Sequence, residues 1–315
     1  MPKSTLGHKN ARLLLAICWT FCFVLSVSFR PTLLPDDLTS RDDFLVSVHA
    51  CQNILTSVST SENSTVPTTI SDLLAEVEHT FVVSVQGCRT TFPPGFAGNV
   101  SCILGNKIDK CAPRKFISGS HEHAMRVTYT HAVILQLSIE AGFQNVAVLE
   151  DDLQFSQTRS YVSASDLRRL LVSSSWSFIR FGYRPYFLQA DGISPCPSPC
   201  RCSTSAKYGQ NLCKLHGSGC DMRSSDFYIV SSATFFDFQS HMLDVKLSNS
   251  KRIIDVYPMR AFSKQWLVLP QVSFQGRLDI PSDYQLGLGA LYVKKCAGPR
   301  PLPVHISEHT TLSSC

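Results

Sequence analysis

The sequence lacks several patterns that would assign a function at once. Its 315 residues contain no run rich in lysine and arginine with interleaved aromatic residues, which argues against a nucleic-acid partner. They also contain no phosphate-binding glycine loop and no serine-centred nucleophile elbow, so two common classes of hydrolase have no motif here. Charged residues make up only 17% of the chain, and 44% of it is hydrophobic. This composition is typical of a globular protein with one large or two modest domains.

One long apolar segment lies near the N-terminus. Residues 13–29 carry no charge, and Lys3, Lys9 and Arg12 precede them. A segment of this length is close to the shortest helix that crosses a bilayer, and a basic flank belongs on the cytoplasmic side. We therefore predict a cytoplasmic tail at residues 1–12, a single-pass type II anchor in the ER or Golgi membrane, and a luminal remainder. Secretion after cleavage of a signal peptide is the alternative.

Cysteine is abundant outside this segment. Of the thirteen cysteines, Cys18 and Cys22 lie in the apolar segment, which leaves eleven beyond it. That density is typical of disulfides in an oxidising compartment, and the odd number implies at least one unpaired or intermolecular thiol. The glycosylation acceptors Asn63 and Asn99 agree with a luminal chain. Because no C-x-x-C pair occurs, residues 194–220 predict a disulfide-stapled surface insertion rather than a zinc site.

The luminal part divides into two regions. Residues 30–79 are rich in serine, threonine and aspartate and predict a stem, with a short amphipathic stretch near residues 71–77. Residues 80–315 predict a globular domain. The expected strands are 81–85, 146–149, 178–184, 227–230 and 265–270, and the expected helices are 117–142, 165–171 and 241–247. The initial order of strand, helix and strand implies a parallel pair within an α/β sheet.

An acidic triplet follows the second expected strand. Residues 146–149 are apolar, and Glu150, Asp151 and Asp152 come directly after them. Ligands of α/β sheets bind beyond the carboxyl ends of the strands, so we expect these carboxylates to face a binding site. Adjacent like charges favour a compensating cation, and oxygen ligands suit Mg²⁺ or Mn²⁺, which usually carry substrate phosphates. A solvated acidic turn is the simpler alternative.

The ordered motifs resemble glycosyltransferase family 25, which includes procollagen galactosyltransferases and bacterial lipooligosaccharide glycosyltransferases. That family has a Ser-His pair, a helix, a glycine and a hydrophobic strand ending in Glu-Asp-Asp. Here Thr130-His131, Gly142 and residues 146–155 resemble this block, with Thr130 in place of the usual serine. Later matches are Trp176–Arg184, Phe227–Ser231, Ile254-Asp255, and Leu269-Pro270 with Gln275. The resemblance spans residues 80–283, and the cysteine-rich insertion departs from it.

The resemblance implies a GT-A-like α/β fold with a mixed, largely parallel central sheet. It implies transfer of a sugar, galactose as a first guess, from a UDP-linked donor to a protein or glycan acceptor. Asp152 is the expected ligand of Mn²⁺ or Mg²⁺, with Asp151 binding the metal or the ribose, and Glu150 is expected to face the donor sugar or ribose. A divalent cation stabilises the charge that develops on the departing diphosphate. The alternative for each acid is a cap of the following turn.

Two further residues are candidates for the reaction. Asp255, between Ile254 and Val256, is predicted to take the acceptor's proton or to orient a substrate, and a helix or turn cap is the alternative. Arg184 is predicted to neutralise the diphosphate, although an ordinary surface arginine would need no explanation.

The histidines bear on whether the chain binds metal, and two other protein classes remain as alternatives. We expect His131 to be a hydrogen-bonded packing residue, whereas His305 and His309 are candidates for a late metal ligand by analogy with some GT-A enzymes. A metal-dependent hydrolase would need several histidine ligands, and their spacing here does not provide them. A catalytically inactive, disulfide-rich binding module is the alternative function.

Overall fold

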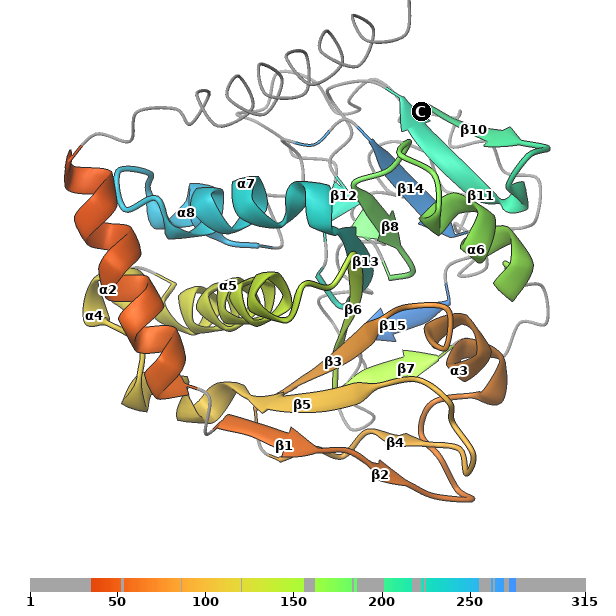
Figure 1. The fold of residues 1–315 in the computed structure, drawn as a ribbon, viewed down its shortest axis with the longest axis horizontal. Helices are drawn as coiled ribbons and strands as arrows, with labels where there is room; N and C mark the ends of the chain where they lie inside the picture. The colour runs from red at the N-terminus through yellow and green to blue at the C-terminus, as the bar shows by residue number, and fades with distance from the viewer. Residues whose placement is uncertain are drawn as a thin grey trace, which may run out of the picture. The chain divides into compact units, whose positions relative to one another are not determined.

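The described residues form a nine-stranded sheet (Figure 1). In order across the sheet its strands are β1 (Leu55–Ser57), β5 (Val100–Leu104), β3 (His79–Ser84), β6 (Asn145–Glu150), β13 (Phe227–Ser231), β8 (Phe178–Arg180), β14 (Gln265–Val268), β11 (Gly209–His216) and β10 (Arg201–Ser205). Strands β5, β3 and β6 are mutually parallel, and β14 is parallel to β8. Strand β13 is antiparallel to both of its neighbours. The sheet is therefore mixed and mostly parallel in its core, which is compatible with a Rossmann-like fold, and the expected α/β class is confirmed.

The computed structural model describes residues 35–51, 54–85, 87–119, 121–155, 162–182, 184–185, 201–216, 222–223, 225–254, 262, 264–268 and 272–275. The chain divides into two compact units, Met1–Asp43 and Phe44–Cys315. Of the first unit, only residues 35–43 are described, and they form the first part of helix α2 (Pro35–Cys51). The predicted anchor at residues 13–29 lies outside the described ranges, and within them no helix combines the length and hydropathy needed to cross a membrane.

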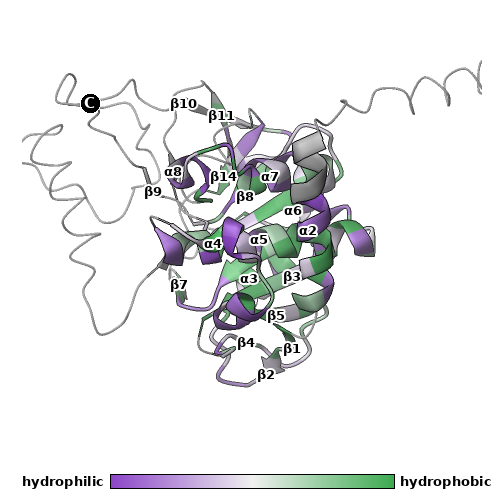
Figure 2. Cartoon of the chain, turned by 90° about the vertical axis from the view of Figure 1, so that its left-hand side faces the viewer, coloured by the Kyte–Doolittle hydropathy of each residue, from purple (hydrophilic) through white to green (hydrophobic). Residues whose placement is uncertain are grey.

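Two sets of helices cover the two faces of the sheet in the second unit. Helices α4 (Arg114–Ile117), α5 (Glu122–Ala141), α7 (Ser232–Leu243) and α8 (Asn249–Arg252) lie on one face, with the end of α2, while α3 (Thr68–Leu74) and α6 (Ala164–Leu171) lie on the other. Successive strand residues alternate between the two cores: Phe81 and Val83 join the first, and Val82 joins the second. In Figure 2 part of the ribbon at β3 is coloured hydrophobic, in agreement with the burial of Phe81, Val82 and Val83.

Several short elements complete the described part. The 3₁₀ helix η2 (Gly105–Lys110) follows β5. The short strand pairs are β2 (Ser59–Thr60) with β4 (Thr91–Phe92), β7 (Leu153–Phe155) with β15 (Ser273–Gln275), and β9 (Arg184–Pro185) with β12 (Met222–Arg223).

The predicted stem requires a correction. Phe44, Val48 and Cys51 are fully buried, and their spacing places them on one side of α2. Residues Ile70, Leu73 and Leu74 of α3 are likewise buried, in the core on the opposite face. Residues 44–79 therefore belong to the globular unit, which begins at Phe44 rather than near residue 80.

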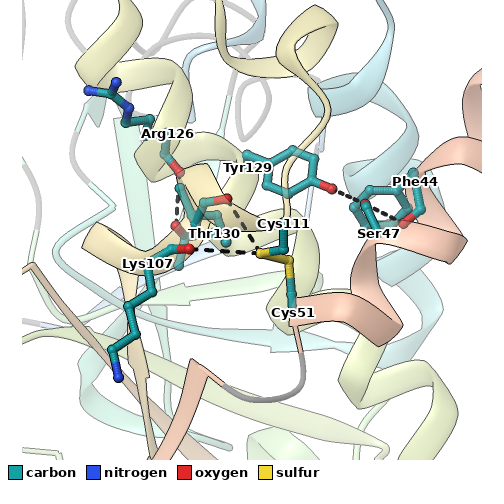
Figure 3. Close-up of a disulfide and its surroundings, with 9 residues drawn as sticks. Phe44, Ser47, Cys51, Lys107, Cys111, Arg126, Tyr129 and Thr130 are labelled. Atoms are coloured by element: carbon teal, nitrogen blue, oxygen red, sulfur yellow. Dashed lines mark hydrogen bonds between the residues drawn. A yellow bond between two sulfur atoms is a disulfide. The ribbon is translucent and has the colours of Figure 1, made fainter.

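A disulfide fixes the end of α2 to the rest of this unit. Cys51 is bonded to Cys111, which follows η2, with their Cα atoms 5.4 Å apart (Figure 3). Close by, the hydroxyl groups of Ser47 and Tyr129 share a hydrogen bond, and Ser47 also donates to the carbonyl oxygen of Phe44 at 2.7 Å. Polar contacts and burial thus hold the end of α2, from Phe44 onwards, against α5.

Two helix predictions were wrong in their extent. The helix expected at 117–142 begins later, as α5 at Glu122, because Ser118 is extended and Gly119 and His121 have positive φ of 105° and 66°. Gly142, with φ of 73°, ends α5 as predicted. The helix expected at 241–247 instead begins directly after β13, because residues 232–243 present an apolar side to the core.

The cysteine-rich segment also differs from the expected surface insertion. Within it, β10 and β11 form a hairpin, and β11 pairs with β14 at the edge of the large sheet. Leu212 and Leu215 of β11 are buried, so this part of the segment contributes to the core. Disulfides were expected from the cysteine content, and the described residues confirm two of them, Cys51–Cys111 and Cys88–Cys102; Cys213 of β11 is also disulfide-bonded.

Candidate functional site

The acidic triplet lies at the carboxyl end of β6. Glu150 is the last residue of the strand, and Asp151 and Asp152 form the turn into β7. The backbone N–H of Glu150 donates to the carbonyl oxygen of Asp226 at 2.9 Å, and the N–H of Asp151 donates to the carbonyl oxygen of Val83 at the same distance. The triplet is therefore tied to both neighbouring strands, β13 and β3.

The three acids differ in exposure. Glu150 and Asp151 are half-buried, whereas Asp152 is exposed. The prediction that the triplet follows a buried strand is confirmed, since Val146, Ala147 and Val148 are completely buried. Of the three acids, only Asp152 is as exposed as the alternative of a solvated acidic turn requires.

Ser84, at the end of β3, holds the side chain of Asp151. Its hydroxyl donates a hydrogen bond to Oδ2 of Asp151 and accepts one from the backbone N–H of Gly87 at 3.1 Å. Burial raises the pKa of Asp151, and the Ser84 hydrogen bond, the positive charge of Arg89 and the residue's own backbone N–H oppose that rise in part. The net pKa shift is upward. A carboxylate held in this way is constrained in position more than one in a solvated turn.

Ser225 and Asp226 also meet the triplet, and the sequence reasoning missed both. The hydroxyl of Ser225 donates to Oε1 of Glu150 at 3.2 Å, and both Ser225 and Asp226 are buried. They precede β13, so they look like the residues of an approaching loop when the sequence is read alone. Because β13 is antiparallel to β6, its beginning lies beside the end of β6. Only the direction of β13 could have revealed this proximity.

The end of β8 packs closely against the same edge. A Cβ atom at Gly182 would lie 2.6 Å from Oγ of Ser273 and 3.4 Å from Cβ of Asp226, so only glycine fits without a shift of its neighbours. The carbonyl oxygen of Phe181 accepts from the N–H of Val272 at 3.1 Å, which joins this strand end to the segment before β15. Since β15 pairs with β7, the chain after the acidic triplet is held beside the end of β8.

The described structure does not test the roles of the other predicted site residues. Asp255, His305 and His309 lie outside the described residues. The backbone of Arg184 is in β9, opposite Arg223 of β12, and its side chain is not among the described parts. Their predicted roles therefore stay predictions.

His131 has the structural role that was expected. Its side chain is completely buried in α5, and Nδ1 is 2.8 Å from the hydroxyl of Tyr228 in β13. The rings of the two residues are also stacked. The prediction of a hydrogen-bonded packing residue is confirmed.

We call the carboxyl end of β6, with Glu150, Asp151 and Asp152, the acidic edge; cation binding there stays a prediction. Mg²⁺-like ions commonly keep several waters and are held by one or two carboxylates together with substrate phosphates. Asp151 and Asp152 provide two adjacent carboxylates of this kind. A site made wholly of protein ligands is not supported, because within the described ranges no group of three or more His, Cys, Asp or Glu residues is arranged to hold a metal.

A scan of the chain against protein-family models found no match, and a search of curated proteins found none either. The resemblance to glycosyltransferase family 25 therefore rests on the sequence motifs alone.

Proposed function

We propose that this protein is a glycosyltransferase that moves a sugar from a nucleotide-sugar donor to a glycan or protein acceptor. The observation that supports the proposal most is the position of Asp151. Its carboxylate is held by Ser84 of β3 at the carboxyl end of β6, within a mixed α/β sheet. Nucleotides commonly bind at this edge of such sheets.

In this proposal, Asp151 and Asp152 hold Mn²⁺ or Mg²⁺, which stabilises the negative charge that the diphosphate gains as its bond to the sugar breaks. Ser84 keeps the Asp151 carboxylate oriented, and Ser225 does the same for Glu150, which faces the donor sugar or ribose. Because both carboxylates are fixed before the ligand arrives, little reorientation is needed on binding.

Two assignments of the proposal rest on sequence alone. Asp255 takes the proton of the acceptor hydroxyl or orients a substrate, and Arg184 neutralises the diphosphate. UDP is the expected nucleotide and galactose the first sugar to test, both because of the family resemblance.

The proposed location is the ER or Golgi membrane, with the globular unit in the lumen. Two disulfides among the described residues support an oxidising compartment, because disulfides persist there and are rare in the cytosol.

A disulfide-rich binding module without turnover is the second candidate. It is favoured by the exposure of Asp152 and by the absence of a three-ligand protein metal site among the described residues. In that case the chain binds a partner without chemistry, and the acidic triplet is not a catalytic metal site.

The test is turnover of a panel of nucleotide sugars by the full chain, produced in a secretory host and purified in detergent. We expect release of one nucleoside diphosphate with Mn²⁺, its loss in Asp152→Ala, and its retention in the control Asp237→Ala, which changes an exposed carboxylate of α7. Metal-dependent nucleotide binding without turnover for any donor would favour the binding module.

A further inference from the structure

A second disulfide joins the loop after β3 to β5, the neighbour of β3 on the side away from β6. Cys88, in the loop after β3, is bonded to Cys102 of β5, and their Cα atoms are 6.2 Å apart. Cys102 is completely buried and is paired in register with Val82 of β3. The loop that follows β3 is therefore covalently attached to β5, the neighbour of β3 in the sheet.

The same loop takes part in the hydrogen bonds that hold Asp151. The backbone N–H of Gly87, the residue before Cys88, donates to Oγ of Ser84, whose hydroxyl donates to Asp151. The positive charge of Arg89, the residue after Cys88, acts on Asp151. The bonded cysteine is thus placed between two residues that act on the acidic edge.

The Gly87–Arg89 loop needs a covalent tether to stay in this conformation. Gly87 has φ of 116°, a conformation that glycine adopts freely, and the side chains of Val85 and Arg89 are exposed. An untethered loop recovers backbone conformational entropy when it leaves this conformation, which favours its release. A covalent bond at Cys88 opposes that release.

We propose that the Cys88–Cys102 disulfide is a positioning device that holds the Gly87–Arg89 loop against Ser84 and thereby pre-orients the acidic edge for its ligand. The identity of that ligand, a nucleoside diphosphate with a divalent cation, rests on the proposed function. The geometric claim, that the disulfide fixes the contact between the loop and Ser84, does not depend on it.

The Cys51–Cys111 disulfide provides a matched control. It joins α2 to the segment after η2, and Sγ of Cys111 is 3.4 Å from the carbonyl oxygen of Ile108 (Figure 3). Its loss releases the end of α2 but leaves the Gly87–Ser84–Asp151 hydrogen bonds in place. Comparing the two disulfides therefore separates a general effect on fold stability, expected for Cys51–Cys111, from a specific effect on the acidic edge, expected for Cys88–Cys102.

The experiment compares the full chain with the double variants Cys88→Ser/Cys102→Ser and Cys51→Ser/Cys111→Ser. Amide hydrogen exchange of the peptide covering residues 84–90, thermal unfolding, and Mn²⁺-dependent UDP binding are measured on each. We expect the first variant to exchange at least tenfold faster in this peptide and to bind UDP about tenfold more weakly. The control variant is expected to unfold at a lower temperature with neither of these changes.

If the serine variant does not fold, Cys88→Ala/Cys102→Val replaces it, because valine suits a buried strand position. Unchanged exchange in residues 84–90, equal effects of the two disulfides, or failure of both Cys88 variants to fold would overturn the proposal. If the unaltered chain does not bind UDP, the proposed function is at fault, and hydrogen exchange still decides whether the disulfide positions the loop.

Discussion

The hydroxyl of Ser84 donates a hydrogen bond to Oδ2 of Asp151, a residue 67 positions later in the chain. This contact joins the ends of the parallel strands β3 and β6 through side chains as well as through the backbone bond from Asp151 to Val83. It fixes the middle carboxylate of the acidic triplet and defines the candidate site.

Ser84→Ala should weaken Mn²⁺-dependent UDP binding by about tenfold or more, since a hydrogen bond to a charged group contributes about 1.5–3 kcal/mol. The control is Ser71→Ala in α3, which removes a buried hydroxyl that has no hydrogen-bond partner among the described atoms. The control should bind UDP normally. Equal UDP affinities for both variants, measured by calorimetry, would contradict a role for Ser84.

Gly182→Ala should destabilise the protein by about 1–3 kcal/mol, because overpacking of a filled site displaces its neighbours. The added methyl group would meet Oγ of Ser273 at 2.6 Å. In Gly105→Ala, by contrast, the nearest atoms are at ordinary contact distances of 3.5 and 3.6 Å, so this control should be nearly neutral. Thermal unfolding of the two variants tests the close approach, and equal melting temperatures would argue against it.

His79 should make the stability of the fold depend on mildly acidic pH. Its ring stacks on Phe143 at 5.0 Å, and burial lowers its pKa below the ordinary value of 6.5. The unfolded chain therefore binds more protons just below pH 6.5, and stability falls as the pH drops from that value towards the lowered pKa.

Urea unfolding at pH 5.5 and 7.5 measures this dependence. In His79→Phe, which keeps an aromatic ring but cannot titrate, the difference between the two pH values should shrink. A pH dependence that is the same in His79→Phe and the unaltered chain would refute the assignment.

Tyr129 should ionise only in strongly alkaline solution. Burial raises its pKa to about 12, although its hydrogen bond with Ser47 lowers it in part. Because the folded pKa exceeds the unfolded value of 10.0, the associated stability is complete below pH 10 and is lost as the pH rises towards 12. The absorbance difference at 295 nm between the unaltered chain and Tyr129→Phe should titrate near pH 12. A midpoint near 10 would contradict burial of this phenol.

Local patterns in the sequence were sufficient for the elements around the site. The apolar run before Glu150 predicted a buried strand, and Gly142 predicted the end of the preceding helix, because both signals lie within a few neighbouring residues. The parallel pairing of β3 and β6 followed from the intervening helix.

Contacts between distant segments were not readable in the same way. Ser225 reaches Glu150 because β13 runs antiparallel, and β11 joins the sheet through β14, which follows it by about 50 residues in the chain. The start of the globular unit at Phe44 was also missed, because the many serine and threonine residues around it obscured the apolar side of α2.

The most direct test of the account is calorimetric titration of UDP into the full chain with and without Mn²⁺, alongside Asp152→Ala and the control Asp237→Ala. We predict binding that requires Mn²⁺, that is at least about tenfold weaker in Asp152→Ala, equivalent to about 1.4 kcal/mol, and that is unchanged in the control. Absence of binding, or binding that is indifferent to both Mn²⁺ and Asp152→Ala, would contradict the acidic edge as a metal–nucleotide site.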